Sequence, residues 1–462
     1  MKKIWLTALV SFLPLTAGAE VYTLPGVVVT AEGQKESTLS PRETITEKDM
    51  KRMGASNVVE ALAMAEGLSL APAGQSAMGG RQLMIGGMNS SQTLVLVDGH
   101  RLADEDTASS QNMNLLQRFN LSQVEQIDII RGADGASYGS SAMGGVVNIR
   151  TKKPGSSESS AGFRLGEGEN TLYFHEDAKG KGPFYLAVSG RVTRVRPLSF
   201  RRDSFSRSIH YDGFDVPSYG IRRYAGLDGL YDFRNGSTLR LKADYFDEDT
   251  SMRFSDASMD VYVRPVVLQH VVLQQDEKSR TERTQWDTSL TYEGKTAGNA
   301  YSGEVYYSRL KKYSETWNGR PDFKDQIHSP YVPPALTSLT SRLDNLLKKL
   351  DNLFKKWDYD RAFYEIWGIS GKDTITRGSH SLTFGSEWNR STYTGTRLSR
   401  ETYSGTGNKD EEGHGQTNGA FYISDTWHMN SRLTFLPSVR LERDSSFGFL
   451  GVPAAGLSYR FN

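Results

Sequence analysis

The stretch VEQIDIIRGADGASYGSSAMGGVVNIR, residues 124–150, determines how the first part of the chain is expected to fold. Two apolar runs, Ile127 to Ile130 and Val146 to Ile149, have the length and composition of buried strands, and five glycines accompany them. Shortly before, Asp98 and Gly99, a favoured hairpin pair, stand between two strand-like segments. These features predict a small, strand-rich N-terminal domain.

Composition excludes several classes of protein. The 462 residues include 55 basic and 54 acidic side chains, so no bulk charge attracts nucleic acid. No cysteine is present, which excludes disulfides and thiolate metal sites. A glycine count of 45 with many aromatic residues is typical of a chain with many strands and turns.

The first residues are expected to direct secretion. Lys2 and Lys3 precede an apolar run, Ile4 to Leu15, and the small residues that follow predict cleavage after Ala19. A membrane anchor, the alternative, needs about 20 apolar residues, and this run is shorter. No later stretch is apolar enough for a membrane helix, so a membrane role would have to use strands.

Two local patterns follow the leader. Val27 to Thr30 are four consecutive β-branched residues, which fit either an ordinary first strand or a docking strand that a partner adds to its own sheet. Asn57 and Glu60 form a capping-box-like start, which predicts a short helix over Val58 to Ala65 that Gly67 ends.

From Ser159 onward the chain alternates apolar and polar residues. In LRLKADY, residues 239–245, the leucines, Ala243 and Tyr245 share one face and the charged residues share the other. A soluble sandwich would bury the apolar face, whereas a membrane barrel would turn it toward lipid. Short turns mostly alternate with much longer loops, as in transmembrane barrels, and about twelve strands are expected.

One long loop contains a leucine-rich insertion. After Pro333 and Pro334, leucines follow a three-and-four spacing from Leu336 to Trp357, which predicts an amphipathic helix. The helix is expected either to pack on the barrel rim or a neighbouring loop, or to take part in gating or partner capture.

Together, the leader, the VVVTA strand, LVLVDG, IDIIRG, YGSSAMGGVVNIRTKK and the strands that follow resemble a TonB-dependent outer-membrane receptor of the siderophore type. The resemblance implies a mainly β fold, with an N-terminal α/β plug domain inside a transmembrane antiparallel β-barrel. It also implies that Val27, Val28, Val29, Thr30 and Ala31 form the TonB box, which the TonB energy-coupling complex pulls.

The resemblance divides the chain into a signal peptide (1–19), a periplasmic arm with the TonB box (20–40), a plug domain (41–154) and a transmembrane β-barrel (155–462). A plug of this size needs the lumen of the 22-stranded class, of which only about 12 strands are expected here. We therefore expect a receptor that is truncated or interrupted within the barrel.

The implied function is energised import of a scarce metal chelate, with a ferric siderophore ahead of haem or cobalamin. A degenerate, non-transporting surface protein or a passive pore is the alternative. No enzyme motif is present, and neither a resident cofactor nor a metal site is expected. The expected location is the outer membrane, with lipid and lipopolysaccharide as neighbours and no nucleic-acid partner.

Candidate ligand-binding residues lie in loops expected on the outer side. Arginine forks and aromatic faces suit an anionic aromatic chelate; the alternative, which the sequence slightly favours, is contact with lipopolysaccharide phosphates or simple solvation. The candidates are Gln75, Met78, Arg81, Arg194, Arg196, Arg201, Arg202 and Phe205.

Overall fold

The computed structural model describes residues 42–55, 57–72, 81–88, 92–104, 116, 118–119, 121–131, 138, 144–155, 159–166, 169–179, 182–196, 198–200, 214–216, 219–254, 257–263, 266–273, 277–318, 357–396 and 412–461. The expected signal peptide, the periplasmic arm with its TonB box and the leucine-rich helix up to residue 356 lie outside these ranges. Trp357, the last residue of that expected helix, instead begins a strand.

The opening stretch forms two adjacent strands of a small mixed sheet, as its apolar runs predict. β5 (Val124–Arg131) pairs antiparallel with β6 (Gly145–Thr151) and with β1 (Arg42–Thr46). β4 (Thr93–Val97) joins the other side of β6 in parallel. A separate hairpin pairs β2 (Leu68–Pro72) with β3 (Arg81–Ile85).

Two short helices cover part of this domain. α1 (Glu47–Arg52) begins at a capping box formed by Thr46 and Asp49, and α2 (Val58–Ala63) begins at Asn57. The amide of Glu60 donates to Asn57 Oδ1 at 2.8 Å, which confirms the predicted helix start. Met50, Leu62, Leu83, Ile127, Ile129 and Ile149 are among the fully buried side chains of the core.

The turn at Asp98 and Gly99 forms, but the hairpin predicted around it is wrong. Both residues have positive φ, 50° and 97°, as a tight turn requires. His100 then makes only a single bridge with Val97, and no strand follows it. β4 is the edge strand of its sheet, and the chain after His100 leaves that edge for the large sheet, where the amide of Ala103 donates to Ser308 Oγ at 2.8 Å.

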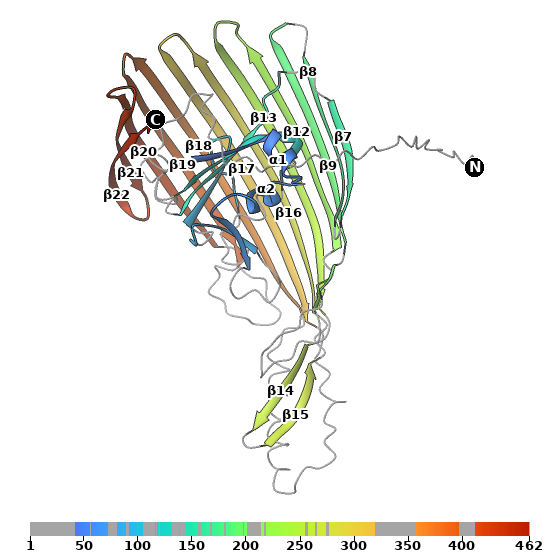
Figure 1. Cartoon of the computed structure of the whole chain (residues 1–462). Helices are drawn as coiled ribbons and strands as arrows, with labels where there is room; N and C mark the ends of the chain where they lie inside the picture. Colours follow the sequence, from blue (N-terminus) through green and yellow to red (C-terminus); the bar gives the residue numbers. More distant parts are fainter. Residues whose placement is uncertain are drawn as a thin grey trace, which may run out of the picture. The chain divides into compact units, whose positions relative to one another are not determined.

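The part of the chain that follows the N-terminal domain forms one twelve-stranded antiparallel sheet (Figure 1). This confirms the predicted mainly β fold and the predicted number of strands. In spatial order its strands are β7 (Ser159–Leu165), β8 (Glu169–Lys179), β9 (Phe184–Val195), β12 (Tyr219–Asp232), β13 (Ser237–Phe254), β16 (Glu277–Lys295), β17 (Asn299–Asn318), β18 (Trp357–Arg377), β19 (His380–Gly395), β20 (Glu412–His428), β21 (Leu433–Asp444) and β22 (Gly448–Tyr459). Two small hairpins, β10 (Leu198–Phe200) with β11 (Phe214–Val216) and β14 (Ala257–Val263) with β15 (Val266–Leu273), lie within the longer connections.

The two faces of this sheet differ in chemistry. One register row, formed by Leu241, Leu290, Val305 and Ile369, is apolar and between 44% and 53% exposed. The opposite face carries Lys242 and Ser289, which are buried. An exposed apolar face is what the barrel interpretation requires and a soluble sandwich would avoid.

Within the described ranges, no helix is long and apolar enough to cross a membrane.

Candidate functional site

The polar face of the large sheet contacts the N-terminal domain along three of its segments. They are the turn and extended chain at 98–104, the residues 118–123 that precede β5, and the chain at 151–155 that leaves β6. Hydrogen bonds and ion pairs dominate these contacts. We take this interface as the candidate site. Its hydrogen-bonding and charged groups can replace their protein partners by water, so the two parts of the chain can separate without leaving these groups unbonded.

Asp98 is the centre of the interface. Its carboxylate accepts hydrogen bonds from the backbone amide of Thr151 at 2.7 Å and from the Thr151 hydroxyl at 2.6 Å. Lys242 Nζ of β13 lies 2.9 Å from Asp98 Oδ2, and Arg240 Nη1 lies 3.8 Å from it. One carboxylate therefore joins the turn after β4, the end of β6 and the wall strand β13.

The charge of Asp98 is stabilised by these neighbours. Burial alone would raise the pKa of Asp98, but the charges of Lys242 and Arg240 and the hydrogen bonds from Thr151 outweigh it. The pKa of Asp98 is thus held well below its usual range. The carboxylate remains ionised at any physiological pH.

Arg240 extends the cluster toward the chain that leaves the domain. Its guanidinium donates to Asp228 of β12, with Nη2 at 2.5 Å, and to the backbone oxygen of Lys152 at 3.0 Å. Lys242 also lies 3.4 Å from Asp244. We call Asp98, Thr151, Asp228, Arg240 and Lys242 the aspartate cluster.

A second contact holds the backbone of Ala103. Its amide donates to Ser308 Oγ of β17 at 2.8 Å, and its carbonyl accepts from Gln285 Nε2 of β16 at 3.1 Å. Ser308 and Gln285 both donate to Asp287, which orients them toward the domain. The chain at Ala103 is therefore fixed through both of its backbone groups.

Aromatic and charged groups continue the interface between these two contacts. His100 stacks on Tyr306 of β17, with ring centroids 4.7 Å apart, and its Nδ1 lies 3.1 Å from Glu304. Burial lowers the pKa of Arg101, although Glu387 and other charges of the wall partly offset this. The turn thus presents several ionisable groups to the wall.

The segment at 118–119 and 121–123 contacts β9 and a further part of β13. Gln123 Nε2 donates to Ser189 Oγ of β9 at 2.8 Å, and Arg191 of β9 donates to the backbone oxygen of Arg118 at 2.6 Å. The Arg118 guanidinium is 2% exposed and lies 5.7 Å from the ring centroid of Phe246.

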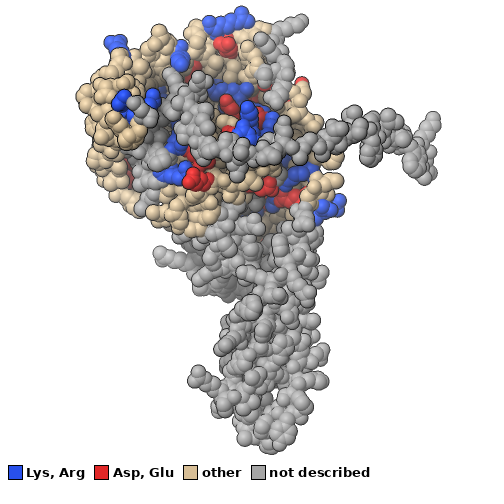
Figure 2. All heavy atoms as spheres, in the orientation of Figure 1, with Lys and Arg blue, Asp and Glu red and all other residues tan. Residues whose placement is uncertain are grey.

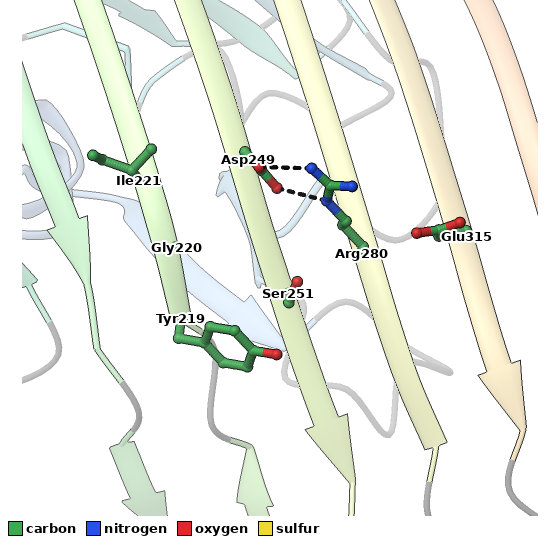
Figure 3. A pocket seen from close by; sticks show the side chains of 7 residues that line it. All are labelled: Tyr219, Gly220, Ile221, Asp249, Ser251, Arg280 and Glu315. Carbon is green, nitrogen blue, oxygen red and sulfur yellow. Dashed lines mark hydrogen bonds and ion pairs between the residues drawn. The ribbon is translucent and has the colours of Figure 1, made fainter.

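A separate recess lies on the opposite, outward face of the sheet (Figure 3). Its volume is about 560 Å³, and Arg280 of β16 and Asp249 of β13 form a two-bonded pair in it, at 2.9 and 2.8 Å. Since Arg280 also pairs with Glu282 at 2.7 Å, its charge is already neutralised. The recess does not meet the interface, and its only arginine is not free to bind an anion. It is lined by Tyr219, Gly220, Ile221, Asp249, Ser251, Arg280 and Glu315.

The structure describes only some of the predicted ligand-binding residues. Arg81 is the first residue of β3. Arg194 is exposed near the end of β9, on the same outward face as Val192 and opposite Ile221 in register. Arg196 follows β9 and donates to the backbone oxygen of Gly166 at 2.9 Å. Gln75, Met78, Arg201, Arg202 and Phe205, like the expected TonB box Val27–Ala31, lie outside the described residues.

Sequence reasoning missed the interface residues. The sequence pattern marks Asp98 only as a turn former, and it marks Arg240 and Lys242 only as members of the polar face of a strand. A signal existed in that strand, because two cations on the buried face of one strand require an acidic partner from another element. Among the described residues, no group of three or more histidine, aspartate or glutamate side chains could hold a metal ion.

The N-terminal domain matches a known family. The model of the TonB-dependent receptor plug domain matches residues 34–146 of this chain. The chain therefore carries a plug domain of this type, and the interface described above lies between the plug and the wall.

Solved structures match the whole fold. A mutant of the ferric enterobactin receptor PfeA from Pseudomonas aeruginosa has a TM-score of 0.60 at 18% identity, covering 92% of this chain and 60% of that one. The siderophore receptor PirA from Acinetobacter baumannii has a TM-score of 0.60 at 16% identity, covering 94% and 61%. The siderophore receptor PiuA from the same organism has a TM-score of 0.57 at 12% identity, covering 91% and 61%.

These proteins are receptors rather than enzymes, and this chain shares their fold. The chain spans about 60% of the length of the receptors that it matches.

Proposed function

We propose that this chain, which carries a TonB-dependent receptor plug domain in the fold of these receptors, acts in the outer membrane in the energised import of a metal chelate. The ligand class that we propose is a ferric siderophore. The TonB energy-coupling complex would supply the force by pairing with Val27–Ala31.

The observation that carries the proposal is the difference between the two kinds of packing in the plug. The plug's own core is apolar, with Ile127, Ile129 and Ile149 fully buried. Its contact with the wall instead uses the aspartate cluster, the Ala103 contacts and the bond from Gln123 to Ser189. A pull on the plug would open the contact before it disrupts the core.

Energetics support this order of events. A typical hydrogen bond contributes only about 0.5–1.5 kcal/mol net, because water replaces the lost partner when the bond opens. Exposing one large apolar core side chain costs roughly 1.5–3 kcal/mol with no such replacement. A polar interface is therefore suited to a plug that moves and returns.

The preference for a ferric siderophore rests on two supports. The matched solved structures are receptors for ferric enterobactin and other siderophores, and the sequence at 196–207 is rich in arginine and phenylalanine. We retain Gln75, Met78, Arg81, Arg196, Arg201, Arg202 and Phe205 as proposed ligand-binding residues. For Arg194, its place on the outward face favours the lipid-contact alternative instead.

The test is uptake of radiolabelled ferric enterobactin by cells that lack their own siderophore receptors and express this chain. Val28→Pro removes a backbone donor from the expected docking strand and should abolish uptake while ligand binding persists. Lys35→Pro, in the same arm but outside the TonB box, is the matched control and should leave uptake unchanged.

Haem and cobalamin supplied in parallel test the other ligand classes. Uptake of either in place of ferric enterobactin would overturn the siderophore assignment but preserve the import function. Equal uptake by wild type and Val28→Pro would indicate a passive pore and overturn energised import.

A further inference from the structure

One glycine of the wall marks a place where three neighbouring strands bring polar oxygens together (Figure 1). Gly226 of β12 lies in register with Ser189 of β9 on one side and with Asp244 of β13 on the other. A Cβ there would lie 2.7 Å from Ser189 Oγ, 2.9 Å from Asp244 Oδ1 and 2.5 Å from the hydroxyl of Tyr224. The glycine therefore leaves open the space in which these three oxygens meet on the polar face.

Asp244 has a partner for each of its carboxylate oxygens. The hydroxyl of Tyr224 donates to Oδ1 at 2.5 Å, and Lys242 Nζ lies 3.4 Å from Oδ2. The same Nζ lies 2.9 Å from the carboxylate of Asp98 in the plug. Asp244 thus connects the plug contact at Asp98 with Tyr224.

Tyr224 in turn reaches the second plug contact, the one that precedes β5. Because its hydroxyl donates to Asp244, its oxygen accepts the hydrogen bonds that Gln123 of the plug and Ser189 make to it. Gln123 Nε2 also donates to Ser189 Oγ at 2.8 Å. Arg191, which donates to a plug carbonyl in the same segment, lies 6.0 Å from the centroid of the Tyr224 ring. Both wall side chains that hold this segment therefore contact Tyr224.

The connecting side chains are shielded from water. Tyr224 is 8% exposed, and Lys242 and Gln123 are each 9% exposed. Buried polar groups depend on their protein partners, and hydrogen bonds in such a chain strengthen one another. A change at one end of the chain is therefore passed to the next member rather than absorbed by solvent. We call Lys242, Asp244 and Tyr224 the relay.

We propose that Asp244 and Tyr224 are positioning residues that make the two plug contacts open together. When Asp98 leaves the wall, Asp244 is the other carboxylate that lies within 4 Å of Lys242, so the ammonium group moves onto it. This draws the carboxylate away from Tyr224, which then no longer holds Gln123. The inference rests on the proposed movement of the plug, but neither on the ligand nor on TonB.

The test is a double-mutant cycle on the full chain in detergent. A dye on Met64→Cys, an exposed plug position, reports plug opening in a urea titration. Gln123→Met removes the amide that bonds to the wall, so it should raise the equilibrium constant for opening about fivefold, as expected for one hydrogen bond. In the Asp98→Asn background the same change should raise the constant less than twofold, because the relay has already shifted.

Two wall variants interrupt the relay without changing a plug residue. Tyr224→Phe removes the hydroxyl and keeps the ring, and Gly226→Ala fills the space in which the three oxygens meet. In either variant, Gln123→Met should raise the opening constant by the same factor, within twofold, with and without Asp98→Asn.

Matched controls come from the outward face of the same strands. Tyr245→Phe removes a hydroxyl from β13, and a Cβ at Gly229 of β12 would lie no closer than 3.6 Å to any neighbour. Tyr245→Phe and Gly229→Ala should both preserve the difference between the fivefold and the twofold effect.

A purely structural role of Tyr224 would change plug stability by one factor in both backgrounds. The inference is therefore overturned if Gln123→Met has the same effect with and without Asp98→Asn in the otherwise wild-type chain, or if the difference persists in Tyr224→Phe. If Gly226→Ala fails to fold, as judged by heat-modifiable electrophoretic mobility, Tyr224→Phe decides the result alone.

The cycle is measured without ligand and without TonB. A failure of ferric enterobactin uptake would contradict the proposed import and leave the coupling intact. Additive effects in the cycle would contradict the coupling and leave import intact.

Discussion

At the scale of single residues, Asp98 connects the plug to the wall. It follows β4 in a left-handed conformation, with a φ of 50°, that aspartate and asparagine tolerate better than most residues. Its carboxylate bonds to Thr151 within the plug and to Lys242 on the wall. The same residue thus shapes the turn and holds the interface.

Replacing Asp98 by Asn tests its charge while keeping the turn. We expect Asp98→Asn to lower the free energy of plug opening by about 3 kcal/mol, because Lys242 loses its closest carboxylate in a buried place. The chain has no cysteine, so a dye on Met64→Cys, an exposed plug position, reports opening in a urea titration. Glu125→Gln, which removes an exposed carboxylate of β5, should change the free energy by less than about 0.5 kcal/mol.

The difference in the free energy of plug opening between wild type and Asp98→Asn should depend on pH. Because the folded-state pKa of Asp98 is lowered, its stabilisation is present above its unfolded pKa of about 3.9 and is lost as pH falls toward the folded pKa. The difference between wild type and Asp98→Asn should therefore be constant above about pH 5 and shrink below about pH 4. A difference that shrinks as pH rises toward 8 would contradict the assignment.

At the scale of elements, the junction of β5 and β6 depends on one glycine. Gly145 has a φ of 145°, and a Cβ there would lie 2.5 Å from the backbone oxygen of Ile130. The opening stretch therefore needs this glycine for close pairing rather than for flexibility.

We expect Gly145→Ala to destabilise the plug by at least about 2 kcal/mol in the same urea titration, because the backbone must move apart. Gly155→Ala provides the comparison, since a Cβ at Gly155 meets nothing within 4 Å. Equal midpoints for the two variants would show that the clash is relieved without cost.

Sequence patterns predict the strands, and the face on which each strand residue lies, better than any other part of this structure. Period-two alternation in LRLKADY correctly assigned Leu241 to the exposed face and Lys242 to the opposite face, because alternation is a local property of strands. The pairing of β4 with β6 was missed, since parallel pairing joins distant residues and leaves no mark in the turn between them. The ionic partners Asp98 and Lys242, 144 residues apart, could not be matched for the same reason.

At the scale of the whole molecule, the sheet presents two chemically different faces. The inward face is polar and contacts the plug, and the outward face has an exposed apolar band. In the view of Figure 2 most of the described surface is uncharged. Under the proposed function, the apolar face would contact lipid and the polar face would accommodate movement of the plug.

The proposed import requires that the plug moves along the polar face while the wall stays in the membrane. Ala103 and Ser308 offer a place to prevent this movement, since the amide of one lies 2.8 Å from the hydroxyl of the other. Because the chain has no cysteine of its own, Ala103→Cys with Ser308→Cys can form a single disulfide between plug and wall.

The most direct test is ferric enterobactin uptake by cells that carry this cysteine pair, measured before and after reduction, with each single cysteine variant as control. Plug movement as proposed predicts that the oxidised pair binds ligand but does not take it up, and that reduction restores uptake. Uptake at the wild-type rate with the disulfide verifiably intact would contradict it.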